Sequence, residues 1–157
     1  MQSRRDLVHC PPTPTAPTPV AAVPRVPSMP QERPPGPPVR VLVADDNPDA
    51  AHSLTLLLEL QGYLARVAPD GEEALALAAA FRPQVLVSEL YLPKLSGLEV
   101  ARRLRLQHRP AELLLVAVTA FGRPEHRHQA HQAGFDHFLL KPVLWAELEQ
   151  LLVRPRE

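Results

Sequence analysis

Apolar residues follow two alternating patterns between residues 39 and 153. Short unbroken runs rich in valine and leucine alternate with longer stretches in which apolar residues recur at helical spacing. The unbroken runs predict strands that are buried on both faces, and the periodic stretches predict amphipathic helices. The predicted strands span 39–44, 63–68, 84–89, 113–118 and 135–140, and the predicted helices span 48–61, 71–81, 97–107, 124–133 and 144–153.

The first predicted helix has the clearest capping signals. Asn47 can accept hydrogen bonds from the free amides of the first turn, and Pro48 fits that turn because its missing N–H would have no helical partner there. Gly62 is of the residue type that most often follows a helix end. We therefore expect this helix to begin directly after the first strand and to end before Gly62.

Strands that alternate with helices favour an α/β fold. Each strand–helix–strand unit forms a right-handed crossover, so successive units build a parallel sheet that is covered by helices on both faces. In such folds ligands bind beyond the carboxyl ends of the strands, where the strand order switches direction. Any chemistry is therefore expected among the residues that follow the strands.

Polar residues of particular types stand at these strand ends. They are Asp45 and Asp46 after the first strand, Glu89 at the third, Thr119 at the fourth and Lys141 after the fifth. Three carboxylates at close range repel one another unless a cation joins them, and Mg²⁺ prefers oxygen ligands of this kind. An ammonium and a hydroxyl beside them can hold an anionic phosphoryl group.

Taken singly, most of these residues have a plainer explanation. Asp45 and Asp46 suit the start of a helix, where the macrodipole stabilises negative charge, and Thr119 and Lys141 suit turns. Glu89 is harder to explain in this way, because a carboxylate at the end of an apolar strand costs free energy unless it is paired. The occurrence of the whole set at matching strand ends favours a functional site.

Four segments resemble a known family. They read VLVADDN (41–47), RPQVLVSELYLPKLSGLEVARRLR (82–105), VAVTA (116–120) and GFDHFLLKP (134–142). In this order they are similar to the receiver domains of response regulators in bacterial two-component systems. The resemblance implies a flavodoxin-like, doubly wound (βα)5 fold at 39–153, with strand order 2-1-3-4-5. A proline-rich tail (1–38) and a short tail (154–157) would flank it.

The resemblance also implies a metal site. Asp45 and Asp46 correspond to the acid pair that binds the metal, and Glu89 and the backbone carbonyl of Tyr91 would complete the set of ligands. The cofactor implied is Mg²⁺. We expect it to be held weakly here, because Glu89 stands where the family has aspartate.

The remaining roles belong to the phosphoryl switch. By resemblance, Thr119 is the switch hydroxyl, Phe138 is the switch aromatic residue and Lys141 contacts the phosphate. The resemblance also implies a cis peptide bond between Lys141 and Pro142, which is physically accessible because X–Pro bonds have lost most of the trans preference.

The substitution at Glu89 changes the expected mechanism. A glutamate carboxylate lies one methylene further from the backbone, and a misplacement of about 1 Å can cost roughly a hundredfold in rate. Ser88 is not a substitute, because neighbouring strand residues point to opposite faces. We expect the longer side chain to reach Lys141 instead, and its charge to imitate a phosphoryl group. Tyr91 and Phe121 flank this position and either narrow the access to it or are ordinary loop residues.

Three functions remain open at this point. The first is a non-enzymatic signalling module that binds a partner without being gated by phosphotransfer. The second is a phosphorelay acceptor that is phosphorylated at Glu89, and the third is a metal-dependent phosphatase, for which the spacing of the acids is unsuitable. The expected partners are a histidine kinase, a phosphotransfer protein or another signalling protein, bound through the face formed by 124–133, 135–140 and 144–153.

The N-terminal region differs in composition from the rest. Residues 1–38 contain 12 of the 20 prolines, which predicts an extended segment with neither helix nor sheet. An alternative is a ligand for an aromatic groove, since Pro14 and Pro17, like Pro24 and Pro27, have PxxP spacing. We expect no output domain after the receiver-like region, and therefore either a single-domain regulator or a receiver tethered through the proline-rich arm.

Charge and cysteine content exclude several classes. The formal net charge is 0, which gives no reason to expect direct binding to nucleic acid or to an anionic membrane. The single cysteine, Cys10, rules out an internal disulfide, and we expect a reducing compartment, the cytoplasm. A lipid anchor at Cys10 is disfavoured because no apolar stretch precedes it.

The histidines at 126, 128, 131 and 137 fit either a solvated helix face, which we favour, or a transition-metal site.

Overall fold

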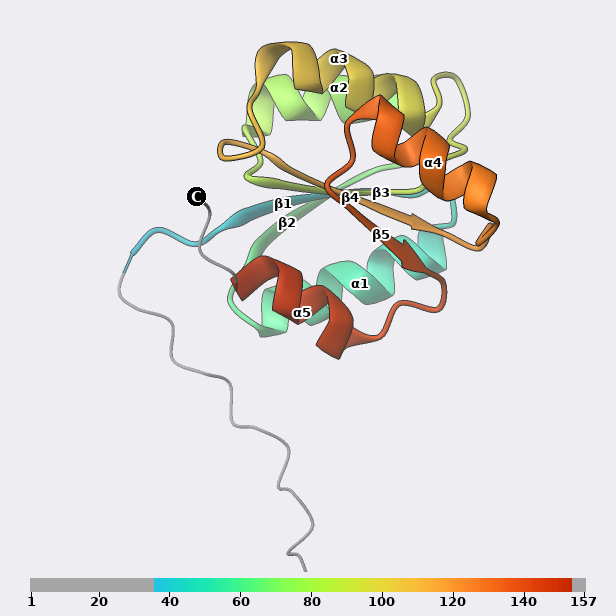
Figure 1. The fold of residues 1–157 in the computed structure, drawn as a ribbon. Coiled ribbons are helices and arrows are strands. Elements are labelled where there is room, and N and C mark those ends of the chain that lie inside the picture. The colour runs from blue at the N-terminus through green and yellow to red at the C-terminus, as the bar shows by residue number, and fades with distance from the viewer. Residues whose placement is uncertain (1–35, 154–157) are drawn as a thin grey trace, which may run out of the picture. The chain divides into compact units, whose positions relative to one another are not determined.

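Residues 36–153 form a parallel sheet with helices on both sides, described here from a computed structural model (Figure 1). The elements are β1 (Arg40–Ala44), α1 (Pro48–Leu60), β2 (Leu64–Ala68), α2 (Gly71–Phe81), β3 (Val85–Ser88), α3 (Gly97–Gln107), β4 (Leu114–Thr119), α4 (Pro124–Ala133), β5 (His137–Leu140) and α5 (Trp145–Val153). The expectations for residues 1–35 and 154–157 fall outside the described residues. None of the helices within 36–153 has the length and apolar character needed to cross a membrane.

The strand order confirms the expected doubly wound fold. All neighbouring strands are parallel, and they lie in the order β2-β1-β3-β4-β5. The chain therefore builds outward from β1 in one direction with β2 and in the other with β3. This switch in direction leaves the carboxyl ends of β1 and β3 side by side, where α/β folds bind ligands.

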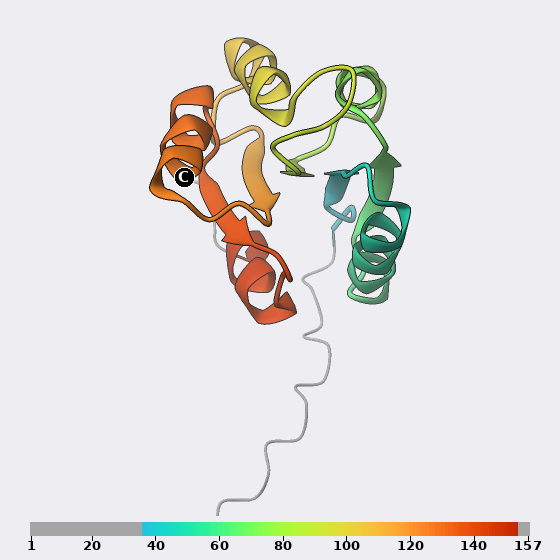
Figure 2. The ribbon, with the colours of Figure 1, turned by 90° about the vertical axis from the view of Figure 1, so that its right-hand side faces the viewer.

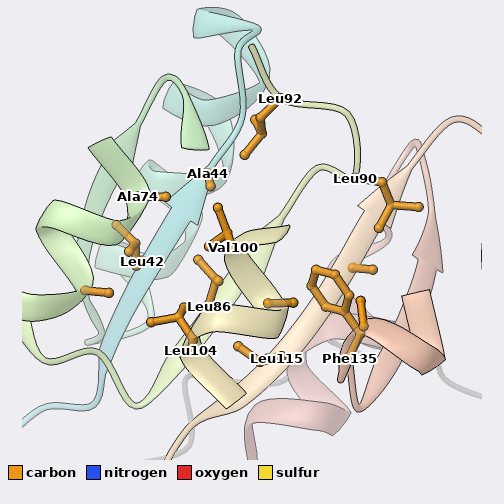
Figure 3. Packing of buried hydrophobic residues seen from close by; sticks show 14 of the residues in the cluster. Leu42, Ala44, Ala74, Leu86, Leu90, Leu92, Val100, Leu104, Leu115 and Phe135 are labelled. Carbon is orange, nitrogen blue, oxygen red and sulfur yellow. The ribbon is translucent and has the colours of Figure 1, made fainter. Parts of the chain in front are cut away.

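Two apolar layers hold the helices to the sheet. Helices α2, α3 and α4 cover one face, and α1 and α5 cover the other (Figures 1 and 2). Because strand side chains alternate, Leu42 and Leu86 point into the first layer, whereas Val41 and Val43 point into the second. Figure 3 shows the first layer, in which Val100 of α3 packs with the strand leucines.

All five strands begin one or two residues later than predicted, and for β2 and β5 the hydrogen bonds at the preceding helix end give the same cause. The aromatic residue after a helix-ending glycine completes the helix end instead of starting the strand. Tyr63 N–H donates to the carbonyl of Leu58 at 3.0 Å, and Phe135 N–H donates to that of Ala130 at 3.1 Å. The glycines that precede these aromatic residues, Gly62 and Gly134, have φ values of 87° and 108°. Residues with a Cβ rarely adopt such values.

The C-terminal end of α4 is tied to α3 by one side chain. The Arg105 guanidinium donates to the carbonyl of Gly134 (2.9 Å from Nη2), to the carbonyl of Leu113 (3.0 Å) and to Asp136 Oδ2 (2.7 Å). Asp136 Oδ2 also accepts the backbone N–H of Leu115 at 2.8 Å. These bonds connect α3, the start of β4 and the turn after α4.

Candidate functional site

The backbone pairing of the sheet gathers the residues that follow the strands. Ala44 is opposite Ser88, and Thr119 is opposite Leu140. The residues that come next are therefore neighbours as well. The backbone N–H of Glu89 donates to the carbonyl of Ala44 at 2.9 Å, and that of Lys141 donates to the carbonyl of Thr119, also at 2.9 Å.

An ion cluster forms where these strands end. The Lys141 Nζ lies 2.8 Å from Asp45 Oδ2 and 3.0 Å from Glu89 Oε2. Asp45 and Glu89 are each only 9% exposed, so the ammonium offsets the cost of burying their charges. The second oxygen of each carboxylate is also bonded, since the N–H of Asn47 donates to Asp45 Oδ1 and the N–H of Leu90 donates to Glu89 Oε1, both at 2.9 Å.

Lys141 is held in its charged form. Burial alone would lower the pKa of its ammonium, but the hydrogen bonds with Asp45 and Glu89 outweigh burial, and the pKa stands above its ordinary value. The predicted contact between Glu89 and Lys141 is therefore present in the structure.

Other predicted site residues lie around this cluster. Asp46 is exposed and forms no ion pair with the described residues, so it does not share Lys141 with Asp45 and Glu89. Thr119 is fully buried, and its Oγ1 accepts the N–H of Phe121 at 3.2 Å. Phe138 is half-buried, and the Arg127 guanidinium lies over its ring. The Cζ of Arg127 is 4.7 Å from the centroid of the Phe138 ring. Arg127 was not anticipated from the sequence.

The cluster does not fit a divalent cation as it stands. The ammonium of Lys141 bridges Asp45 and Glu89, where a metal would have to bind both. Within residues 36–153 no three side chains of histidine, cysteine, aspartate or glutamate are grouped so that they could hold a metal ion. The proposed ligand set of Asp45, Asp46, Glu89 and the Tyr91 carbonyl remains a prediction.

Ser88 is unsuited to accept a phosphoryl group. Its side chain is fully buried, and its hydroxyl donates to the backbone carbonyl of Glu89 at 2.8 Å. It lies beneath the start of α3, where a Cβ on Gly97 would come within 3.0 Å of the hydroxyl oxygen. The cis peptide bond implied between Lys141 and Pro142 is also present.

An aromatic clamp, which we define as Tyr91, Phe121 and His126, lies at the rim of the site. The ring centroids of Tyr91 are 5.4 Å from Phe121 and 5.7 Å from His126, and both pairs are edge-to-face. The Tyr91 Oη is also 2.5 Å from His126 Nδ1 and 3.4 Å from Gln129 Oε1. The helical pattern favoured a solvated face for His126 and could not predict this contact, because such a pattern does not show which loop lies opposite.

The loop between β3 and α3 is also fastened to α2. Lys94, at φ 68°, places its Nζ 3.3 Å from Asp70 Oδ2. The N–H of Glu73 donates to Asp70 Oδ1 at 2.8 Å, and this bond is the largest cause of the lowered pKa of Asp70. A Cβ on Gly71 would stand only 1.8 Å from the carbonyl oxygen of Leu95, so the loop passes directly over the start of α2.

Comparison with known proteins gives one consistent family. Residues 41–153 match the sequence model of the response regulator receiver domain. A 14.6 kDa protein of Leptolyngbya boryana of uncharacterised function is 38% identical over 71% of this chain and 86% of its own length. The response regulator MprA of Mycolicibacterium vanbaalenii is 40% identical over 76% of this chain, which spans only 49% of that relative.

Solved structures give the same result. The chemotaxis protein CheY4 of Vibrio cholerae has a TM-score of 0.68 at 28% identity, covering 74% of this chain and 97% of that one. A co-crystal of Saccharomyces cerevisiae Ypd1 with the receiver domain of Ssk1 scores 0.66 at 26% identity, with coverage of 73% and 86%. A Burkholderia pseudomallei response regulator with a phosphorylated aspartic acid and a calcium ion scores 0.65 at 30% identity, with coverage of 71% and 64%.

Proposed function

The chain belongs to the response regulator receiver domain family. On this premise we propose that it is a signalling module in which the Glu89 carboxylate, paired with Lys141, imitates the charge of a phosphoryl group. Two-component signalling is the setting that the family gives. What is proposed is the particular form: a receiver that binds a partner without depending on phosphotransfer. The observation that carries the proposal is the Lys141 Nζ at 3.0 Å from Glu89 Oε2.

The extra methylene of glutamate is consistent with this contact. It brings a negative charge closer to the lysine that would otherwise contact an incoming phosphate. The N–H of Leu90 fixes the other oxygen, so the carboxylate has a defined orientation. An arrangement favoured in this way by about 1 to 2 kcal/mol has its population raised severalfold.

Phosphorylation of Glu89 itself is the alternative function. Phosphoryl transfer would require the Glu89 carboxylate to give up its contact with Lys141 or with the N–H of Leu90. It would also have to align with the phosphodonor from a position one methylene further from the backbone than an aspartate carboxylate. The Burkholderia relative carries phosphate on an aspartic acid, which supports aspartate as the ordinary acceptor. A metal-dependent phosphatase is the third candidate and has no carboxylate pair at the required spacing.

A phosphotransfer protein, a histidine kinase or another signalling protein is the proposed partner. The co-crystal of Ypd1 with the Ssk1 receiver shows such a partnership in a related structure. For this chain we propose the face of α4, β5 and α5, which holds a hollow of about 400 Å³. The side chains that line this hollow are Arg127, Ala130, His131, Phe135, Asp136, His137, Phe138, Leu139 and Leu151. Its mixed polar and apolar lining suits a transient complex in the cytoplasm.

Intact-mass measurement after incubation with acetyl phosphate and Mg²⁺ tests the proposal. We expect no adduct on the natural protein and a phosphoryl adduct on Glu89→Asp, with Glu89→Gln as the unreactive control. An equal adduct on the natural protein would favour the phosphorelay acceptor. Continuous release of phosphate without an adduct would favour the phosphatase.

A further inference from the structure

The N-terminal half of α4 has few anchors of its own. Within α4 only Ala130 and Ala133 are buried, and both lie in its C-terminal half. Arg123, which precedes the helix, makes no capping hydrogen bond with its side chain. The position of the first turns must therefore depend on side chains that come from outside the helix.

The aromatic clamp supplies such an anchor. A phenol has one proton to donate, so both bonds of Tyr91 coexist when His126 Nδ1–H donates to the phenol oxygen and the phenol O–H donates to Gln129 Oε1. His126 and Gln129 are three residues apart on α4 and share a helix face. Tyr91 therefore holds two successive turns of α4 from the loop that follows Glu89.

Glu89 and Thr119 each accept a hydrogen bond from the backbone next to this clamp. Glu89 Oε1 accepts the N–H of Leu90, the residue before Tyr91. Thr119 Oγ1 accepts the N–H of Phe121, whose ring is 5.4 Å from that of Tyr91. A displacement of the Glu89 or Thr119 side chain would therefore disturb a hydrogen bond to Phe121, a residue of the clamp, or to Leu90, the residue next to it.

We propose that the aromatic clamp carries the arrangement of the Glu89 site to the N-terminal half of α4, with Tyr91 and His126 as positioning residues. The contacts run without a gap from Lys141 to Glu89, then to the backbone at Leu90, to Tyr91 and to α4. The meaning of this path rests on the proposed function, because α4 belongs to the proposed partner face. Arg127 on Phe138 is a separate contact of the same helix, which does not pass through Tyr91.

Amide hydrogen exchange of the full chain tests the anchoring. Tyr91→Phe keeps the ring and removes both hydrogen bonds, so the amides of residues 127–131 should exchange at least about two- to tenfold faster, which is the effect of losing a single hydrogen bond. His126→Ala should do the same. His128→Ala is the matched control, because His128 is exposed on the same helix and has no contact with Tyr91. Equal exchange in His126→Ala and His128→Ala would overturn the proposal.

A double-mutant cycle tests whether the clamp transmits the state of the site. Glu89→Gln should change the exchange of residues 127–131 severalfold when Tyr91 is intact, and should change it little in the Tyr91→Phe background. An equal effect in both backgrounds, or none in either, refutes transmission through the clamp. Should Glu89→Gln not fold, Glu89→Asp replaces it. No partner or phosphodonor is present, so this outcome is separate from the test of the proposed function.

Discussion

Lys141 sets the charge balance of the site at the scale of single residues. Its ammonium faces two nearly buried carboxylates, Asp45 and Glu89, which together leave one net negative charge. A buried acid that loses its cation keeps its desolvation cost and gains repulsion from its neighbour. The folded state should therefore depend more on this lysine than on any lysine at the surface.

Replacing Lys141 with methionine should expose this dependence. We expect the free energy of unfolding to fall by about 2 kcal/mol, below the full cost of breaking a buried pair because Lys141 is partly exposed. Urea denaturation at neutral pH measures it. Lys94→Met is the matched control, since its side chain is 61% exposed in its ion pair with Asp70, and should cost less than about 0.5 kcal/mol. Equal losses would show that the ion cluster is not a special stabilising feature.

Asp70 should make the stability depend on acid pH. The Glu73 N–H and Lys94 lower the pKa of Asp70 in the folded state, so its ionised form is stabilised by folding. That contribution is present above about pH 4, where the unfolded carboxyl is ionised, and is lost as the pH falls through the lowered folded value. Asp70→Asn keeps a capping side chain but removes the charge.

The pH dependence of unfolding by urea checks this. The natural protein should be more stable than Asp70→Asn at pH 6, and the difference should shrink as the pH falls below 4. Asp49→Asn, at an exposed position in the first turn of α1, is the control. A difference that does not vary between pH 6 and pH 3 would contradict the assignment.

Of the residues that the sequence predicted to lie together, the structure brings Asp45, Glu89 and Lys141 into contact, and their roles remain predictions. Strand ends and residue types indicated Asp45, Glu89, Thr119 and Lys141, because parallel strands bring their carboxyl ends to one edge. The same rule did not distinguish the exposed Asp46 from the buried Asp45 beside it. The role of His126 depends on a loop distant in sequence, and no helical periodicity reports it.

At the scale of elements, the bounds of the helices were more predictable than the starts of the strands. Helices α2, α3 and α4 begin and end as the patterns of caps and apolar residues predicted. Strands β2 and β5 begin later, because Tyr63 and Phe135 donate to the helices before them. Apolar character alone does not tell whether an aromatic residue closes a helix or opens a strand.

Gly71 should be the glycine that tolerates substitution least at a helix start. In Gly71→Ala the new Cβ meets the backbone of Leu95, which cannot move without shifting the β3–α3 loop, so we expect a loss of about 2 to 4 kcal/mol. Gly62→Ala is the comparison, because a Cβ there meets nothing within 4 Å and only its φ of 87° is unfavourable, at about 1 kcal/mol. Thermal unfolding of both variants measures the difference. A larger loss in Gly62→Ala would contradict this ranking.

At the scale of the whole molecule, a bound ion would raise the free energy of unfolding. Any ion that binds only the folded chain raises the free energy of unfolding in proportion to the logarithm of its concentration. Since Lys141 already bridges Asp45 and Glu89, we expect Mg²⁺ to raise that free energy by less than about 0.3 kcal/mol at ten millimolar. In Lys141→Met, where the carboxylates lack a cation, the gain should exceed about 1 kcal/mol.

Thermal unfolding with Mg²⁺, and with sodium chloride at the same ionic strength, separates specific binding from screening. A gain in the natural protein as large as that in Lys141→Met would show that the ammonium does not compete with the metal. That result would also support the magnesium site that the family resemblance implies.

The bonds of Arg105 have a mechanical consequence for α4. They fix its C-terminal end, at Gly134, to α3 and β4, whereas the other end is held mainly by side chains at the rim of the site. A helix of 10 residues is about 15 Å long. Pivoting by roughly 10° about the Arg105 end would swing the first turn through about 2.5 Å while leaving the last turn almost still. The helix thus has the form of a lever, with its fulcrum at Arg105 and its opposite end at the aromatic clamp.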